Sequence, residues 1–316
     1  MIEALDLALE QGIHADPDDD ARFEVYADWL TAQGNPRGEL AAIQLARARA
    51  DSPELAERES ALLEQHAEQF RGVHRTRFTA WLDDLCILQY KAGFWRSLSF
   101  GGSHEELSMV LAHPSARLLH TLRIHAIDDY ASDFATAIAA LANTRPSLGA
   151  LRELRIGDMP EGQDALVGFG ERSCTNLDAL AEPYPRLATL RLLCPNFDLG
   201  EREFVGLRWL DARMGASAAS LAALGRARLP SLEALELGFE TSPEEDAMYP
   251  ELAWPEDALD ELLAAIDTRM PALRQIRLWP MPHTLDHPLI QRLADMPRIE
   301  IVDWDEVEDS SGAYEL

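Results

Sequence analysis

A short apolar repeat in the C-terminal two thirds of the chain restricts the fold more than any other sequence feature. Four copies start at a proline and share the same later apolar positions, at residues 185–192, 230–237, 271–278 and 297–304. Looser copies bring the total to eight, with second apolar positions at Leu98, Leu122, Leu154, Leu190, Leu210, Leu235, Ile276 and Val302. Apolar and polar residues alternate within the copies, which is typical of a strand with one buried face. The repeat therefore predicts about eight short strands.

The segments between these strands predict helices. Successive second apolar positions lie 20 to 41 residues apart, which leaves room for a helix in most gaps. Most gaps close on a proline, such as Pro146 or Pro230, where a helix must stop before the chain enters its strand. One such unit cannot bury its apolar face alone, so we expect stacked units with a parallel inner sheet and outer helices. The predicted class is an α/β solenoid.

Residues 1–92 show helical periodicity instead of the repeat. The acidic run Asp18–Asp20 suits a helix start, where free amide groups and the helix dipole favour negative charge. That helix should end at Gly34-Asn35-Pro36, and a later one should follow the cap Ser52-Pro53. We therefore predict two domains: an all-α capping domain at residues 1–92, and a repeat domain at residues 93–316 that contains an acidic insertion at 240–256 and an acidic C-terminal tail.

Both regions resemble known families. The repeat region resembles bacterial cytoplasmic leucine-rich repeat proteins, although the Asn or Cys that often follows the strand is present only as Asn196 and Cys194. The N-terminal region resembles the helical repeat-companion domain found beside such repeats, through Asp18-Asp19-Asp20-Ala21-Arg22, Tyr26-Ala27-Asp28-Trp29-Leu30, Gly34-Asn35-Pro36-Arg37-Gly38-Glu39-Leu40 and Gln44. The resemblance implies a leucine-rich repeat solenoid with a helical cap and a role in protein interaction. It implies no catalytic residue.

The motifs that suggest chemistry have simpler interpretations. Asp16–Asp20 lacks the glycine and glutamate that a calcium loop requires at its sixth and twelfth positions, so helix capping is favoured. Residues 215–219 approach a nucleophile elbow but lack its second glycine. His283 and His287 are bracketed by prolines and have no further zinc ligand at a suitable spacing. We therefore predict no catalytic residue, no metal and no cofactor.

The repeat assigns one series of residues to the exposed concave face of the sheet. The residue between the last two apolar positions of each copy projects from that face. In chain order this series is Ser99, Arg123, Arg155, Arg191, Asp211, Glu236, Arg277 and Asp303. Three consecutive arginines on neighbouring strands would repel one another. Two interpretations stay open: nearby acids neutralise the arginines, or the arginines bind an acidic ligand.

Aromatic residues add to the predicted binding surface, since Trp and Arg are the residues most enriched in binding hot spots. Trp209 occupies an exposed strand position, and Trp279 lies just past the end of a strand. The acidic insertion adds Tyr249 and Trp254, and insertions in repeat proteins often form contact loops. The alternative for Trp209 and Trp279 is packing against the insertions or the tail, and the alternative for Tyr249 and Trp254 is a solvated loop. The predicted partner-binding residues are Arg123, Arg155, Arg191, Trp209, Arg277, Trp279, Tyr249 and Trp254.

Composition limits the partners. The 28 basic and 55 acidic residues give a formal net charge of −27, which argues against direct binding to nucleic acid or to an anionic membrane. No signal peptide, membrane-spanning stretch or disulfide pattern is present, so we expect a cytoplasmic protein. Our first hypothesis is a non-enzymatic scaffold or adaptor that binds a protein partner through the concave face. The alternative is an acidic inhibitor or nucleic-acid mimic that blocks a basic site using the insertion and tail.

Overall fold

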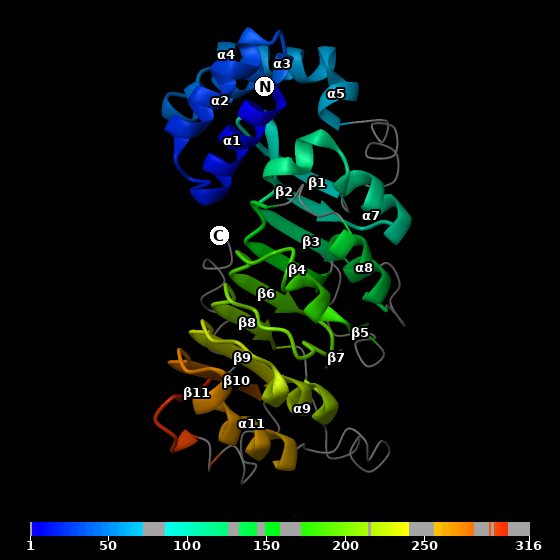
Figure 1. Cartoon of the computed structure of the whole chain (residues 1–316), viewed down its shortest axis with the longest axis vertical. Helices are drawn as coiled ribbons and strands as arrows, with labels where there is room; N and C mark the ends of the chain where they lie inside the picture. The colour runs from blue at the N-terminus through cyan, green and yellow to red at the C-terminus, as the bar shows by residue number, and fades with distance from the viewer. Residues whose placement is uncertain are drawn as a thin grey trace. The chain divides into compact units, whose positions relative to one another are not determined.

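The protein is an α/β structure with one large, mostly parallel sheet (Figure 1). The computed structural model describes residues 2–71, 86–125, 133–143, 149–158, 172–213, 216–239, 256–280, 291 and 294–302. Within these residues the sheet has nine strands in the order β1-β2-β3-β4-β6-β8-β9-β10-β11. Their bounds are β1 Cys86–Lys91, β2 Phe94–Phe100, β3 Thr121–His125, β4 Glu153–Asp158, β6 Thr189–Leu192, β8 Trp209–Ala212, β9 Ala234–Phe239, β10 Gln275–Pro280 and β11 Ile299–Ile301. A separate parallel pair consists of β5 Ser173–Cys174 and β7 Asn196–Phe197.

The chain forms two compact units. The first consists of Met1–His125, Ala140–Glu153 and Pro160–Gly162, and the second of Ala126–Ala139, Leu154–Met159 and Gln163–Leu316. The first unit therefore combines the helical N-terminal segment with strands from beyond residue 92. Its helices are α1 Ile2–Ala15, α2 Asp20–Ala32, α3 Pro36–Arg49, α4 Pro53–Gln65, α5 Ala67–Arg71, α7 His104–Leu111 and the 3-10 helix η1 Pro114–Leu118.

Capping residues set the helix boundaries of the first unit, at Asp19 and Ser52 as the sequence indicates and also at Asn35. Asp19 caps α2 by accepting a hydrogen bond from the Ala21 amide, and Asn35 caps α3 in the same way from the Arg37 amide. Ser52 caps α4. Phe23 and Tyr26 of α2 are buried in a cluster that includes residues of α1, α3, β2 and η1. Burial of large side chains of this kind stabilises the fold by about 1.5–3 kcal/mol each.

Strand β1 is a correction to the predicted all-α segment. Cys86–Lys91 pairs antiparallel with β2 through a turn at Ala92 and Gly93. Both turn residues have positive φ, 49° and 81°, which is the backbone geometry of tight hairpins. The helical periodicity therefore ends before Cys86, and the hairpin belongs to the sheet.

The predicted strand positions are confirmed for seven of the eight repeats. Their second apolar residues all lie within strands and are at most 3% exposed: Leu98, Leu122, Leu154, Leu190, Leu210, Leu235 and Ile276. The eighth is wrong in register, because β11 spans Ile299–Ile301 and places Ile299, not Val302, opposite Ile276. Residue Asp303 lies outside the described residues, and Glu300 takes the strand position assigned to it.

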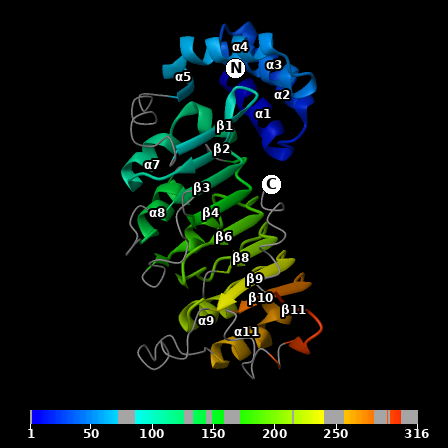
Figure 2. The same cartoon turned by 180° about the vertical axis from the view of Figure 1, so that it is seen from behind.

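The second unit places its helices beside its parallel strands. They are α9 Ala218–Arg226, α11 Glu256–Arg269, the 3-10 helix η3 Leu177–Leu180 and the first part of α8 Ala135–Asn143. Helices α9 and α11 lie side by side in both views (Figures 1 and 2). Ser217 caps α9 by accepting a hydrogen bond from the Ser220 amide, so it has the structural role that the sequence favours. Leu221 and Leu224 of α9 are fully buried.

Candidate functional site

Five charged residues lie in register across one face of the second unit's strands. They are Arg191 of β6, Asp211 of β8, Glu236 of β9, Arg277 of β10 and Glu300 of β11. Because side chains alternate between the two faces of a strand, all five project from the face opposite the buried leucines. We call these five residues the charge row.

Each arginine of the charge row has a carboxylate partner. Nε of Arg191 lies 3.3 Å from Oδ2 of Asp211, close enough for an ion pair although not aligned as a hydrogen bond. Nη1 of Arg277 lies 3.5 Å from Oε1 of Glu236, and its Nε donates to Oε2 of Glu300 over 3.0 Å. Opposite charges on neighbouring strands attract one another. The described contacts therefore support neutralisation by acids for Arg191 and Arg277.

A sixth residue, Arg213, connects the two central acids of the row. It follows β8 and makes two parallel hydrogen bonds to the Asp211 carboxylate, of 2.9 and 2.8 Å, while its Nε lies 3.4 Å from Glu236 Oε2. The side chains of Asp211 and Glu236 are only 3% and 4% exposed. Buried carboxylates require such pairing because ions lose their hydration energy inside a protein. With Arg213, three cations balance three acids.

Trp279 belongs to this arrangement and is not an exposed anchor. It lies within β10, is 5% exposed, and donates its indole N–H to Oε2 of Glu236 over 3.0 Å. The Arg213 guanidinium lies 4.8 Å from the centre of its ring, within the range of a cation–π interaction. Burial, together with the nearby Asp211 carboxylate, raises the pKa of Glu236. Trp279 thus packs within the protein, against Glu236 and Arg213.

Trp209 is the exposed aromatic residue on the same face. It begins β8, is 40% exposed, and lies in register with Thr189 on one side and Ala234 on the other. Both neighbours are small, so neither can cover the indole ring. The Trp209 side chain makes no hydrogen bond or ring contact with the residues that the structure describes. A large aromatic side chain therefore stands open beside the charge row.

The other predicted site residues are distributed differently. Arg123 lies half-buried on β3 of the first unit, in register with Ser99 of β2. Arg155 lies half-buried on β4 in the second unit. Tyr249 and Trp254 lie outside the described residues, as does most of the acidic insertion. The charge row contains Arg191 and Arg277, and the predicted series Arg123, Arg155 and Arg191 lies on β3, β4 and β6, which follow one another in the sheet order.

Comparisons with known proteins leave the family open. No protein-family model and no curated protein matches the chain. A crystal structure of a protein from Bacteroides fragilis aligns with a TM-score of 0.40 and 14% identity, covering 82% of this chain and 80% of the other. Similarity at this level does not establish a shared fold.

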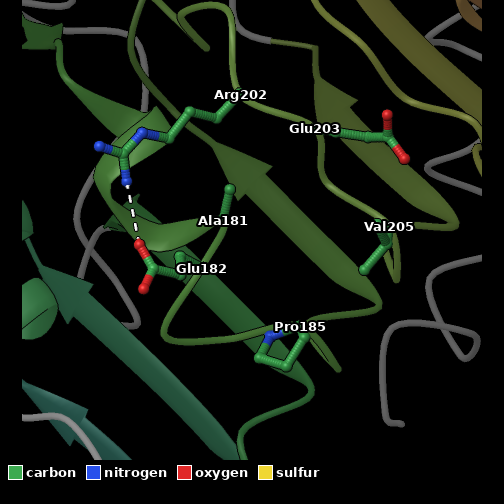
Figure 3. A pocket seen from close by; sticks show the side chains of 6 residues that line it. All are labelled: Ala181, Glu182, Pro185, Arg202, Glu203 and Val205. Carbon is green, nitrogen blue, oxygen red and sulfur yellow. Dashed lines mark hydrogen bonds and ion pairs between the residues drawn. The ribbon is translucent and has the colours of Figure 1, made fainter.

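A pocket of about 380 Å³ elsewhere in the second unit lacks a functional arrangement (Figure 3). Arg202 points toward Glu182 across it, with Nη1 3.5 Å from Oε2, whereas the Glu203 side chain points away from this pair. Arg202 and Glu182 are 54% and 64% exposed. Exposed ion pairs contribute little because water and salt screen them. This pocket supports no chemistry.

The described residues contain neither a cluster of metal ligands nor a membrane-spanning helix. No three His, Cys, Asp or Glu side chains converge there as a metal site would require. Within the same part of the chain, no helix combines the length and apolar character needed to cross a bilayer. The two cysteines described with their side chains, Cys174 and Cys194, are buried free thiols.

The sequence reasoning missed two members of the site. Glu300 was missed because the last repeat was aligned three residues too late. Arg213 lies two residues after Asp211, so the two-residue period of a strand already places it on the same face. The predicted strand ended at the last apolar position of the repeat, Ala212, so Arg213 was not assigned to it.

Proposed function

We propose that the chain is a non-enzymatic, cytoplasmic scaffold of the leucine-rich repeat type that binds a protein partner through the face carrying the charge row. In this proposal the strands form the concave inner sheet of a solenoid, and the helical N-terminal segment is its cap. The parallel register of β6, β8, β9 and β10 and their alternating burial support the repeat architecture. The buried free thiols of Cys174 and Cys194 agree with a reducing compartment.

The exposed indole of Trp209 is the observation that carries the proposal. Exposed aromatic rings with small neighbours can be covered completely by a partner, and tryptophan is among the residues that contribute most to binding. The cross-strand neighbours Thr189 and Ala234 are small, and 40% of Trp209 stays exposed to such a partner.

The charge row determines what kind of partner fits. Its buried charges are balanced within the protein, so they present no strong net field to a ligand. Arg277 and Glu300 remain 40% and 52% exposed and can make polar contacts near the boundary of an interface. We therefore expect a partner with an apolar side chain for Trp209 and mixed polar groups around it.

Affinity capture with the full chain tests the proposal. Trp209→Ala should lower the recovery of a specific partner about ten-fold or more, because a central aromatic contact is lost. Val205→Ala is the matched control, since Val205 is 48% exposed but lies outside the strands. A partner that both variants retain equally contradicts binding at Trp209.

Salt dependence separates this proposal from an electrostatic inhibitor. Binding through a charge-balanced face should weaken by less than about three-fold between 50 and 500 mM salt, whereas an acidic mimic should lose most of its affinity. Steep salt dependence would therefore contradict the scaffold proposal.

A further inference from the structure

A second pocket, within the first unit, has a volume of about 490 Å³. Helices α1 and α2, the start of α3, the middle of α5, strand β2 and η1 all contribute to its walls. The wall residues used below are Asp6, Trp29, Gln33, Arg37, Phe94 and Arg117. We call it the aromatic pocket. Cavities of this volume are typical of small-ligand sites.

Arg37 supplies a buried positive charge to this pocket. It is 4% exposed and donates hydrogen bonds to Gly93 O (3.0 Å), Ser115 Oγ (2.7 Å) and Gln69 O (2.7 Å). All three acceptors are neutral, and no carboxylate of the described residues pairs with Arg37. A guanidinium has five N–H donors, so two have no partner within this part of the chain.

An aromatic wall lies beside this cation. The Tyr26 ring stacks against Trp29 on one side, with 5.9 Å between centroids, and against Phe94 on the other, with 5.6 Å. The Arg37 guanidinium in turn lies 5.3 Å from the centre of the Phe94 ring. Trp29 is only partly buried, so its ring can contact a molecule in the pocket.

Acidic groups also lie at this pocket, where Asp6 is one of the wall residues. The Tyr26 hydroxyl lies 2.7 Å from Asp6 Oδ1 and 2.9 Å from Glu10 Oε1, and burial with these carboxylates raises the pKa of Tyr26. Arg117 forms ion pairs with both carboxylates, at 3.5 and 3.1 Å. Two carboxylates against one cation leave net negative charge among these groups, which disfavours a ligand with several negative groups.

We propose that the aromatic pocket binds a ligand with one carboxylate attached to a planar apolar body. The carboxylate pairs with the two remaining N–H groups of Arg37, and the body stacks against Trp29. An ionised partner is the group that best compensates a buried guanidinium, because charged hydrogen bonds are stronger than neutral ones. The same chemistry could come from a free aromatic acid or from the C-terminal residue of a peptide.

Calorimetric titration of the full chain tests this ligand class. The free-acid probes are phenylacetate and its neutral match phenylacetamide; the peptide probes are N-acetyl-glycyl-phenylalanine and its C-terminal amide. Each acid should bind at least about ten-fold more tightly than its amide. Preference for phenylacetate identifies a free acid as the source, and preference for the peptide acid identifies a C-terminus. Equal affinity of acid and amide, or no binding by either acid, overturns the proposal.

A charge added to the pocket wall tests the location without disturbing Arg37, whose removal threatens folding. Gln33 is exposed and lines the pocket, so Gln33→Glu should weaken phenylacetate binding about three-fold or more. The variant should leave binding of phenylacetamide unchanged. Gln11→Glu is the control, since Gln11 is an exposed helical glutamine outside the pocket wall. If both variants affect the acid equally, the carboxylate does not bind in this pocket.

Discussion

Arg37 in the first unit and Arg213 in the second have opposite kinds of hydrogen-bond partner. In the first unit, Arg37 donates only to neutral oxygens, on residues that lie 32, 56 and 78 positions away in sequence. In the second unit, Arg213 donates to Asp211, two residues away, and lies beside Glu236 of the next strand. Arg37 therefore connects distant segments, whereas Arg213 balances charge between neighbouring strands.

This difference has an electrostatic consequence. Burial without an anionic partner lowers the pKa of Arg37 to about 10, so it stays protonated at neutral pH but holds an uncompensated charge. In the second unit the carboxylates compensate Arg213, and the cost of burial appears instead as a raised pKa of Glu236. Neutral acceptors leave the positive charge of Arg37 available to a ligand, whereas the carboxylates of the charge row neutralise Arg213.

Removing Arg37 should give the largest loss of stability. Arg37→Met leaves the buried acceptors on Gly93, Gln69 and Ser115 without this donor, at a cost of about 4 kcal/mol in the free energy of unfolding. Urea unfolding followed by far-UV circular dichroism measures it. Arg49→Met on the same helix is the control, since Arg49 is 58% exposed. Equal losses of unfolding free energy in the two variants would show that the hydrogen bonds of Arg37 do not stabilise the fold.

In the second unit, the backbone of Gly238 in β9 packs closely against the backbone of Arg213, and a substitution can test this contact. A Cβ atom at Gly238 would overlap the Arg213 carbonyl oxygen, so Gly238→Ala must separate the backbone of Arg213 from β9, at a cost of about 3 kcal/mol. Gly225→Ala in α9 is the control, because its Cβ meets only ordinary contacts at 3.5 Å or more and alanine favours helices. Urea unfolding should separate the two variants clearly. A neutral result for Gly238→Ala contradicts the close approach.

Asp211 tests whether carboxylates hold the charge row together. Asp211→Asn keeps the size of the side chain but removes the anionic partner of two arginines, at a cost of about 2 kcal/mol. The remaining excess positive charge should also lower the pKa of Glu236, which a pH titration of the variant by carboxylate NMR detects. An unchanged pKa of Glu236 would mean that the two acids are not coupled.

For the charge row, the sequence predicts which face of the sheet the residues occupy but not how they pair. Arg191, Asp211, Glu236 and Arg277 were placed on one face because a two-residue period needs no knowledge of the neighbouring strands. Whether they pair was not predictable, since it depends on side chains from different repeats and on Arg213 lying over them. The burial of Trp279 was not predictable for the same reason, because it depends on Glu236 and Arg213 from other repeats.

Register and turns were harder to predict than strands. The last repeat contains apolar residues at Ile299, Ile301 and Val302, so two alignments satisfy the alternating pattern. Backbone hydrogen bonds from Ile276 to Arg298 and from Val302 to Leu278 select the earlier one. Strand β1 was missed because the positive φ of Ala92 is unusual for alanine and is not visible in the sequence. The aromatic pocket combines six elements, which local patterns cannot bring together.

The first unit should also lose stability as the pH falls, through His120. Burial, reinforced by the positive charge of Arg96, lowers the pKa of His120 to about 4 from 6.5. Between these values the unfolded chain binds a proton that the folded chain does not, so the free energy of unfolding decreases from pH 6.5 toward pH 4. His120→Gln should reduce this slope, measured as urea midpoints at several pH values. An identical slope in wild type and variant would contradict the assignment to His120.

Substitution of Arg277 should give the smallest change in the free energy of unfolding, because this end of the charge row is exposed. Its side chain is 40% exposed and its closer partner Glu300 is 52% exposed, so water screens that pair; its other partner, the buried Glu236, keeps Arg213 as a second cation. Arg277→Gln should change the free energy of unfolding by less than about 1 kcal/mol, well below Asp211→Asn. Urea unfolding of the two variants side by side measures the difference. If Arg277→Gln lowers the free energy of unfolding as much as Asp211→Asn does, then pairing, and not burial, determines how much each charge stabilises the fold. Exposed Arg277 and buried Arg37 would then not differ for the reason given above.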